Sequence, residues 1–538
     1  MFGNCSRSLV KGFLRAQGTA LVNGDENKIV LTGWGLGNWL LPEGYMWLAG
    51  EGNRFDRPRR IEQVIRELTG ETYAREFWQR YRQAYVCEAD IAEMAALGYN
   101  SVRIPINWRV LMEDAPGVRF IKDGFRLLDN CIDWCEKYGL YAFLDLHAAP
   151  GGQTGANIDD SVDDRPRLFT DAGAWEQAIA LWKELARRYR DRWIVGGYDL
   201  LNEPIRPGLS EGKALDPYLP RLVEFYRECI AEIRRIDRRH LLSIEGSHWA
   251  TDVSIFHQRF DDNAVLHFHR YACMPGKEAL DEFTAAADRM QIPLWLGETG
   301  ENIHEWFAAM YPLCVLMGIG YNLWPWKKMA CENSPVSICK PDGWDEIIAY
   351  THGGTKPSAA YVTRILETYL HNIRIENCRR NPGLTNAVFR KPGFSLRGTD
   401  FDELPGEGCS YYNPEKRGNL YYRSNTQMDI VLLPGADDTS RFAFDSGWDR
   451  LALRMTGGTF SSYYIQSPEA PFHIRFSFTA QADTQCAITW QGEQTRFSAA
   501  KSAELVCYTA TCKAGAGSIR LEVESGALVL SSLEVIKT

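Results

Sequence analysis

The sequence predicts a (β/α)8 barrel followed by an all-β sandwich of the jelly-roll type. Short apolar runs alternate with amphipathic segments over residues 30–370, the runs number eight, and helical periodicity stops near residue 373. Parallel strands that helices cover on both faces read as nearly continuous apolar runs, which is the pattern of such barrels. A doubly wound sheet is the alternative, but no GxGxxG turn follows the first run.

The expected strands are short apolar runs that end in or next to polar residues. They cover residues 29–37, 99–107, 140–147, 195–204, 240–246, 264–271, 293–298 and 318–326. Helix-like segments lie between them over 74–97, 125–138, 175–189, 218–237 and 303–317, and a last helix is expected over 358–369. Trp175, Ile179 and Trp182 show the helical spacing, because side chains three and four residues apart share one face.

The C-terminal third has a different sequence pattern. Gly, Ser and Asp separate short strand-like runs, which cover residues 441–445, 451–455, 472–480, 485–490, 504–511, 518–525 and 527–536. Many short strands with regular turn signals are typical of an antiparallel sandwich or jelly roll. We therefore expect a barrel domain over residues 1–375 and a sandwich domain over residues 376–538, packed directly because no low-complexity linker separates them.

Composition excludes several classes of protein. Lys and Arg total 60 against 69 Asp and Glu, which gives a net charge of −9, and 45% of the residues are hydrophobic. This mild acidity argues against a nucleic-acid partner, since such proteins carry a basic face. No apolar stretch of about 18 residues is present, so no membrane span is expected.

The N-terminus and the cysteines bear on the cellular compartment. The first 20 residues lack the continuous apolar run of a secretory signal, and none of the 14 cysteines forms a CxxC pair. These features predict a cytoplasmic protein with reduced thiols. The alternative is a secreted protein whose signal has been trimmed.

Two glutamates follow expected strands. Glu203 lies in the sequence LNEP after the fourth run, and Glu298 lies in GET after the seventh. Functional side chains of barrel enzymes collect at the carboxyl ends of the strands, and strands four and seven lie across the mouth from each other. A carboxylate pair is the equipment for glycoside hydrolysis, in which one protonates the leaving oxygen and the other meets the oxocarbenium-like carbon. The alternative role of Glu203 is to cap the following helix.

The residues around these acids suit the same chemistry. Arg103 offers a permanent charge that would keep Glu298 ionised, although an interior salt bridge is an equal alternative, and the Tyr271 hydroxyl can donate to the same carboxylate. Glu203 needs a raised pKa to hold a proton near neutral pH. Asn202 could bind the 2-hydroxyl of a sugar.

Histidines and one tryptophan complete the candidate site. His147 and His269 are expected to bind the sugar or to orient a glutamate, and Trp324 to form the floor beneath the reacting sugar. His147, His267 and His269 could instead hold a metal, because HxH on a strand puts both rings on one face. We expect no metal and no cofactor, since carboxylate catalysis needs none. Asp145 and Glu245 are expected to be structural.

The ordered motifs resemble glycoside hydrolase family 5, the cellulase-like retaining β-glycosidases. The motifs are VRIP (102–105), LDLH with PGGQTG (144–147 and 150–155), LLNEP (200–204), HxY (269–271), GE (297–298) and NLWPWK (322–327). The resemblance implies that Glu203 is the acid/base and Glu298 the nucleophile. It also implies a surrounding shell, which is Arg103, His147, Asn202, His269, Tyr271 and Trp324.

Two segments resemble particular branches of the family. GWGLGNWL and HAAPGGQTGANIDDS are most similar to the exo-β-1,3-glucanases and β-glucosidases. Thr299-Gly300 after the second glutamate and the long loop 45–60 depart from that pattern, and Trp47 and Phe55 in this loop could close a subsite. Because Pro325 follows Trp324, and X–Pro bonds adopt the cis form far more readily than others, we also predict a cis Trp324–Pro325 bond.

The C-terminal domain resembles carbohydrate-binding module family 6. The similarity lies in GEGCSYYN (406–413), YR (422–423), MDI (428–430), IRLEVESG (519–526) and LEV (533–535). It implies glycan contact through an aromatic clasp, for which Tyr411, Tyr412 and Trp448 are the candidates. The alternative is a domain that only packs against the barrel or walls its active site.

The sequence thus predicts a retaining glycosidase that cleaves β-glucosidic bonds by double displacement. Its expected partner is an oligosaccharide or glycoside substrate, and the branch resemblance favours exo action on short β-glucan oligosaccharides or β-glucosides. An endo-β-1,4-glucanase is the alternative within enzymes. A non-catalytic carbohydrate-binding protein is the alternative of another class.

Overall fold

A computed structural model describes residues 2–538 except 51–53, 208–216, 418–421, 434–435 and 437–447. It confirms a closed barrel of eight parallel strands, with the order β10-β3-β4-β5-β6-β7-β8-β9. The strands are β3 (Thr32–Gly35), β4 (Ser101–Asn107), β5 (Tyr141–Ala148), β6 (Val195–Asp199), β7 (Leu241–Glu245), β8 (Ala264–Arg270), β9 (Leu294–Gly300) and β10 (Gly320–Trp324). All eight expected runs therefore contain a barrel strand.

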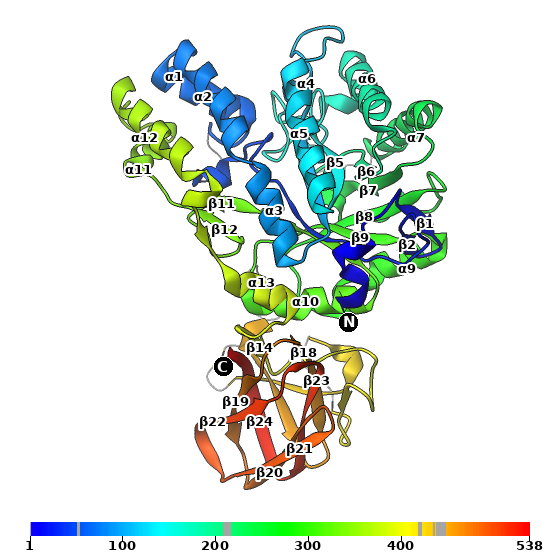
Figure 1. The fold of residues 1–538 in the computed structure, drawn as a ribbon, viewed down its shortest axis with the longest axis vertical. Helices are drawn as coiled ribbons and strands as arrows, with labels where there is room; N and C mark the ends of the chain where they lie inside the picture. Colours follow the sequence, from blue (N-terminus) through cyan, green and yellow to red (C-terminus); the bar gives the residue numbers. More distant parts are fainter. Residues whose placement is uncertain (1, 51–53, 208–216, 418–421, 434–435, 437–447) are drawn as a thin grey trace.

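Helices surround the barrel (Figure 1). They are α1 (Pro58–Thr69), α2 (Glu71–Ala84), α3 (Glu88–Leu97), α4 (Trp108–Leu111), α5 (Lys122–Tyr138), α6 (Ala172–Tyr189), α7 (Leu219–Ile236), α8 (Ser247–Ala250), α9 (Asp281–Met290), α10 (His304–Leu316), α11 (Trp344–Thr351), α12 (Ala359–Asn372) and α13 (Pro382–Phe389). The single helix expected over 74–97 is wrong: the chain forms α2 and α3 instead. A new helix starts at Glu88 because the Asp90 carboxylate accepts the backbone N–H of Cys87 at 3.0 Å.

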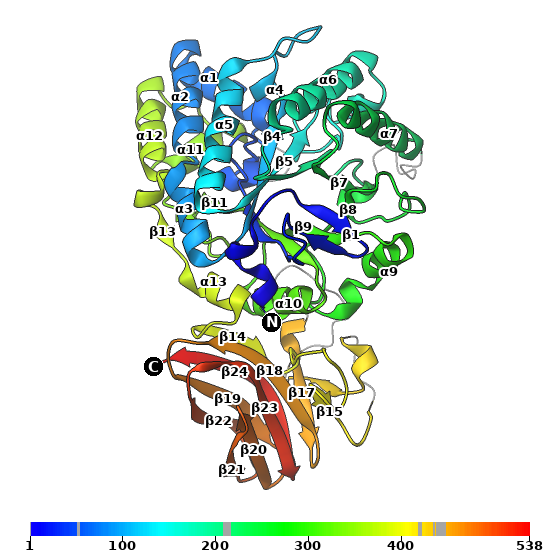
Figure 2. The same cartoon turned by 45° about the vertical axis from the view of Figure 1, so that its right-hand side comes forward.

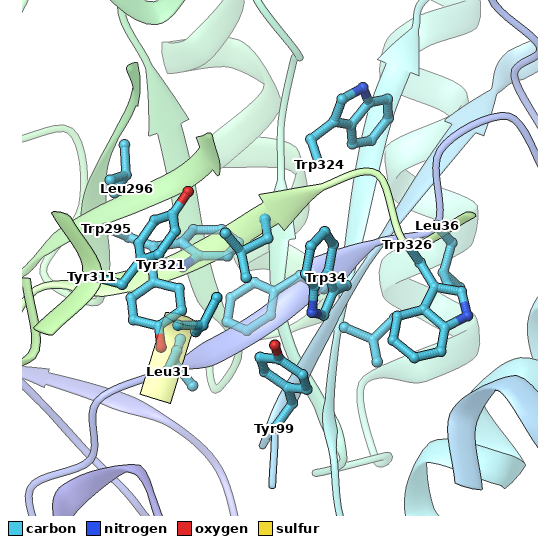
Figure 3. Close-up of a cluster of buried hydrophobic side chains, with 14 of the residues drawn as sticks. Leu31, Trp34, Leu36, Tyr99, Trp295, Leu296, Tyr311, Tyr321, Trp324 and Trp326 are labelled. Atoms are coloured by element: carbon cyan, nitrogen blue, oxygen red, sulfur yellow. The ribbon is translucent and has the colours of Figure 1, made fainter. Parts of the chain in front are cut away.

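Large aromatic side chains fill the interior of the barrel. Trp34, Trp295 and Tyr321 are fully buried, and the rings of Phe143 and Trp295 lie 4.5 Å apart inside the barrel. Figure 3 shows Trp324 set apart from this cluster, at the end of β10. Trp324 is itself buried, at 3% exposed, and belongs to the upper end of this core.

Short strands outside the barrel form two small sheets. β1 (Arg15–Gln17) pairs with β2 (Ala20–Val22), and β11 (Lys327–Met329), β12 (Val336–Ile338) and β13 (Arg379–Arg380) form a three-stranded sheet. The Trp324–Pro325 bond between β10 and β11 is cis, as predicted.

The C-terminal part contains two antiparallel sheets. One has the order β16-β17-β24-β19-β22 with β14 paired to β24, and the other has the order β15-β18-β23-β20-β21. The strands are β14 (Phe394–Arg397), β15 (Tyr411–Tyr412), β16 (Asp429–Leu432), β17 (Leu451–Thr456), β18 (Phe460–Ser467), β19 (Phe472–Ala480), β20 (Thr484–Trp490), β21 (Glu493–Ala499), β22 (Ser502–Cys512), β23 (Gly515–Ser525) and β24 (Ala527–Lys537). Six of the seven expected runs contain a strand, and the seventh, 441–445, lies outside the described residues.

The barrel side of the chain continues past residue 375, where the boundary between the two domains was expected. β13 pairs with β12 and α13 packs on α10, so both belong to the barrel side. β14 is the first strand of the sandwich. Figure 1 and Figure 2 both show α10 and α13 between the barrel and the sandwich.

A buried arginine joins the two parts. The Nε of Arg390 donates to the carbonyl of Ala308 in α10 at 2.7 Å, and its Nη1 donates to Asp402 at 2.6 Å. A second set of contacts reaches the loop after β8, where the Tyr422 hydroxyl donates to the Pro275 carbonyl at 3.2 Å and the Lys277 N–H donates to Glu403 at 2.9 Å. The sandwich is thus fixed to the barrel by buried polar bonds.

Two other features of the chain were expected from the sequence. All the cysteines carry free thiols in the structure. Among the described residues, no helix combines the length and the apolar character that crossing a bilayer requires.

Replacing Arg390 with Met is expected to destabilise the protein by about 3–5 kcal/mol, because it strands the buried Asp402 carboxylate without its cation. Both side chains are at most 5% exposed. Urea denaturation followed by tryptophan fluorescence measures the change. The matched control is Arg475→Met, which breaks a half-exposed pair with Glu534 and should cost no more than about 1 kcal/mol. Equal unfolding midpoints for the two variants would refute the assigned role of Arg390.

Candidate active site

One guanidinium organises the carboxyl end of the barrel. Arg103 on β4 is fully buried, and its fork donates to Asp199 at 2.9 Å, to Glu245 at 3.1 Å and to Glu298. A fourth carboxylate, Asp145, lies 3.1 Å from the same guanidinium. Since an arginine keeps its charge at any relevant pH, this cation offsets part of the negative charge that four strands bring together.

Glu298 lies on β9, and its neighbours favour the ionised form of its carboxyl group. Besides Arg103, the Tyr271 hydroxyl donates to it at 2.7 Å. Burial would by itself raise the pKa of Glu298, but attraction to His269 and Arg103 outweighs burial, and the pKa is lowered from its ordinary value. The residue is 5% exposed, so the barrel mouth still reaches it.

Glu203 follows β6 and has the opposite character. Burial raises its pKa to about 7, repulsion by Glu298 adds to the rise, and a 2.7 Å bond between its Oε1 and His269 Nδ1 opposes it. Its backbone has a left-handed φ of 43°, and two bonds hold this conformation. The Glu203 N–H donates to Glu245 at 2.6 Å, and Thr154 Oγ1 donates to the Glu203 carbonyl at 2.6 Å.

The carboxyl groups of Glu203 and Glu298 lie close together. An oxygen of Glu203, an oxygen of Glu298 and a ring nitrogen of His269 all lie within 4.8 Å of one another. Glu203 is 8% exposed, so neither acid is sealed from solvent. Two carboxyl groups this close, one with a raised and one with a lowered pKa, can act on a single bond as proton donor and as anion.

Two hydrogen-bonded histidines, His267 and His269, determine which proton Glu203 can share. His267 Nδ1 lies 2.9 Å from Ser243 Oγ and 3.2 Å from Asp199, and burial lowers the pKa of His267 to about 3. The neutral His267 ring therefore donates from Nδ1 and accepts at Nε2, which lies 3.1 Å from His269 Nε2. His269 must then donate from Nε2. Its Nδ1 is left to share one proton with Glu203.

The remaining predicted residues lie around the same space. His147 Nδ1 bonds Asp145 at 2.7 Å, and the Asn202 amide donates to its Nε2 at 3.2 Å, which suits a neutral ring because burial lowers the pKa of His147 to about 3. Trp324 stacks on His147 with the ring planes 5° apart. The structure thus brings together all eight predicted residues, including Arg103, Asn202, His269 and Tyr271.

Glycines of the first strand make room for Trp324. A Cβ at Gly35 would lie 2.5 Å from the Trp324 ring, and a Cβ at Gly37 would lie 2.8 Å from it. The spacing of GWGLG therefore follows from the position of one indole across the barrel seam, where β10 pairs with β3.

The loop after β3 differs from the expectation. Trp47 and Phe55 do not close a subsite: both are buried, and Trp47 packs against Trp344 and Tyr369. They anchor the loop instead. The residue that reaches the site is Tyr45, whose hydroxyl accepts the Trp324 Nε1–H at 2.9 Å.

Several acids of the site were missed or assigned a lesser role from the sequence. Asp145 and Glu245 were expected to be structural, yet Glu245 bonds both Arg103 and the backbone of Glu203. Glu43 and Asp199 were not singled out at all. Glu43 is buried, its pKa is raised by burial and by Glu298, and its Oε1 has no partner among the described residues. Asp199 ends an apolar strand, which was an available signal, whereas Glu43 lies in the loop after β3 and had none.

Two sets of residues have ligand atoms close enough to hold a metal ion. Within the described residues these sets are Glu245 with His267 and His269, and Glu203 with His269 and Glu298. His269 Nδ1 already bonds Glu203, and His269 Nε2 bonds His267 Nε2. A metal would therefore have to displace these bonds.

The aromatic candidates of the sandwich do not form an open clasp. Trp448 and Tyr411 are buried, and the Trp448 Nε1–H donates to Asp400 at 3.1 Å. Tyr412 alone of the three is exposed, at 36%. The prediction of a three-residue glycan contact is wrong for the two buried rings, because they pack into the sandwich.

Comparisons with known proteins concern mainly the barrel. Residues 67–329 match the cellulase family, glycosyl hydrolase family 5. The chain is 32% identical to a beta-xylosidase of Phanerodontia chrysosporium over 57% of this chain and 61% of that protein. It is 28% identical to a glucan 1,3-beta-glucosidase of Candida oleophila over 44% of this chain and 60% of that protein. The chain thus spans about three fifths of these relatives.

A solved structure of an endogalactoceramidase aligns with nearly the whole chain. The alignment covers 97% of this chain and 99% of the other at 17% identity, with a TM-score of 0.49.

Replacing Arg103 with Met is expected to destabilise the protein by about 3–5 kcal/mol, more at pH 8 than at pH 5. Burial already raises the pKa of Asp145 and Glu245, and loss of the cation raises both further. The folded variant then binds more protons than the unfolded chain, so its stability falls as the pH rises. Urea denaturation at both pH values measures this. An equal loss at pH 5 and pH 8 would mean that charge is not the cause.

Proposed function

We propose that this chain, whose residues 67–329 match glycosyl hydrolase family 5, hydrolyses β-glucosidic bonds with retention, by double displacement. The observation that carries the proposal is the pair Glu203 and Glu298, whose nearest oxygens lie within 4.8 Å and whose pKa values are shifted in opposite directions. Carboxyl groups about 5–5.5 Å apart are typical of retaining enzymes, whereas about 6.5–9.5 Å is typical of inverting ones.

In the first step, the ionised Glu298 attacks the anomeric carbon. The glycosidic C–O bond breaks, and Glu203 delivers its proton to the departing oxygen, so that an alcohol leaves and the sugar remains as an ester of Glu298. Arg103 and Tyr271 hold Glu298 in its charged form and fix its direction. Asn202 and Trp324 are proposed to contact the sugar, as the family resemblance implies.

In the second step, a water molecule replaces the departed alcohol. Glu203, now a carboxylate, takes a proton from this water, the water oxygen bonds to the anomeric carbon, and the ester bond to Glu298 breaks. Two inversions restore the β configuration. The histidine chain supports this cycle because His269 shares the proton of Glu203 and is itself fixed by His267.

The preferred substrate is proposed to be a short β-glucan oligosaccharide or a β-glucoside, attacked from its end. Tyr45 supports exo action because its hydroxyl ties the loop after β3 to the site: it accepts the Trp324 Nε1–H at 2.9 Å and donates to Glu301 at 3.2 Å. The name of one relative, glucan 1,3-beta-glucosidase, favours the same choice. Endo-β-1,4-glucanase action is the second candidate, since endoglucanase C of Acetivibrio thermocellus is 28% identical over 36% of this chain and 53% of that protein.

The C-terminal sandwich is proposed to support the barrel rather than to bind glycans. Glu403 and Tyr422 bond the loop that follows Tyr271, and Glu278 in the same loop accepts the Ser424 N–H at 2.8 Å. The cytoplasmic location expected from the sequence stays a prediction.

The pH dependence of kcat/KM should be bell-shaped. Glu203 must be protonated to act as acid, so activity is present below its pKa of about 7 and lost above it. Glu298 must be ionised to attack, so activity is present above its lowered pKa and lost below it. The check is a profile from pH 4 to pH 9. With Glu203→Gln and an activated aryl β-glucoside, the alkaline limb should disappear; a limb that persists would assign it to another group.

Single replacements of the two acids should differ in their dependence on the leaving group. Glu298→Gln is expected to abolish turnover of every substrate, because no ester can form. Glu203→Ala should lower kcat/KM by about 10²–10⁴-fold for alkyl β-glucosides and much less for dinitrophenyl β-glucoside, whose leaving group needs no proton. Glu504→Gln, an exposed change in the sandwich, is the matched control. Wild-type turnover by Glu298→Gln would overturn the nucleophile assignment.

A further inference from the structure

A cavity of about 440 Å³ opens among the loops at the carboxyl end of the barrel. It lies among the loops that follow β3, β5 and β6. Its lining includes Tyr45, Arg57, Arg60, Ala156, Asp164 and Arg206. The mechanism described above uses none of its charged residues.

The cavity is directly connected to the catalytic groups. Tyr45 on one wall accepts the N–H of Trp324. Arg206 on another wall lies three residues after Glu203, and its backbone N–H donates to the carbonyl of Thr154 at 3.5 Å, the residue whose hydroxyl bonds Glu203. Arg206 and Glu203 therefore belong to the same loop after β6, and Glu203 is the group assigned to the leaving oxygen.

Two of the three arginines are already neutralised. Arg57 bonds Asp56 at 2.8 Å and also bonds Asp164. Arg60 bonds the same two aspartates, at 2.9 Å and 3.1 Å. Two cations and two anions therefore cancel within this wall, and Arg57 is further fixed by Ser161 at 2.8 Å.

Arg206 is different because no described residue is its counter-ion. Its side chain forms no ion pair with any described residue, and its Nε is buried without a hydrogen-bond partner in the described structure. An arginine that lines a cavity and has no described counter-ion can bind an anionic ligand there through its guanidinium fork. Among the described residues that line the cavity, three arginines stand against two aspartates, so this lining carries one net positive charge in a protein whose net charge is −9.

We propose that this cavity binds a carboxylate on the leaving-group side of the substrate, such as the carboxylate of a uronic acid, and that Arg206 is its counter-ion. A planar carboxylate fits the planar fork of a guanidinium with two parallel bonds, which a neutral sugar hydroxyl cannot form. This inference rests on the proposed function and narrows it to acidic aglycones.

The test compares two aryl β-glucosides of similar reactivity, one with a 4-carboxylate and the other with a 4-carboxamide on the phenol. The wild type should prefer the carboxylate, and Arg206→Gln should lower the ratio of the two kcat/KM values about tenfold, as expected for one charge-assisted bond. Arg165→Gln is the matched control, because this exposed arginine lies in the loop after β5 and does not line the cavity. It should leave the ratio unchanged.

Three outcomes would overturn the inference: no preference in the wild type, an unchanged ratio in Arg206→Gln, or an equal fall of the ratio in Arg165→Gln. The last would show that a general surface field, and not Arg206, selects the anion. If the wild type hydrolyses neither glucoside, the proposed function fails. Calorimetric titration of wild type and Arg206→Gln with glucuronate and glucose then tests the cavity separately, and equal binding of both sugars by the wild type would refute it.

Discussion

The buried charge of Arg103 is the interaction on which the rest of the site depends. Carboxylates from β5, β6, β7 and β9 meet around it, and without a permanent cation their mutual repulsion would oppose closure of the barrel end. The guanidinium has a fixed planar geometry, so it also sets the angles at which these strands present their acids. Charge balance and geometry are therefore supplied by one side chain, and the two glutamates inherit their positions from it.

The two glutamates show how one residue type acquires two characters. Glu298 has a cation and a hydroxyl as neighbours, whereas Glu203 has a histidine and lies against other acids. Burial acts on both, so the difference comes from the partners and not from the depth. The left-handed turn at Glu203 belongs to the same arrangement, because Glu245 accepts the Glu203 N–H with one oxygen and bonds Arg103 with the other.

The sequence was informative where the physical signal is local. All eight barrel strands could be predicted, because burial on both faces leaves a continuous apolar run, and Glu203 and Glu298 could be found because each ends such a run. Glu43 and Asp199 could not be ranked, since their importance depends on which side chains lie opposite in the closed barrel. For the same reason Trp448 was mistaken for a surface residue: its burial depends on Asp400, which lies 48 positions away.

The contact between the sandwich and the loop after β8 has a consequence for how this chain can vary. Appended sugar-binding modules are commonly exchangeable because few contacts cross to their neighbours. Here Arg390, which directly follows α13, and the amide of Lys277 find their partners in the C-terminal part, in Asp402 and Glu403. A recombination that swapped this part for another would leave polar groups of the barrel unsatisfied, so the two halves are bound to be inherited as a single unit.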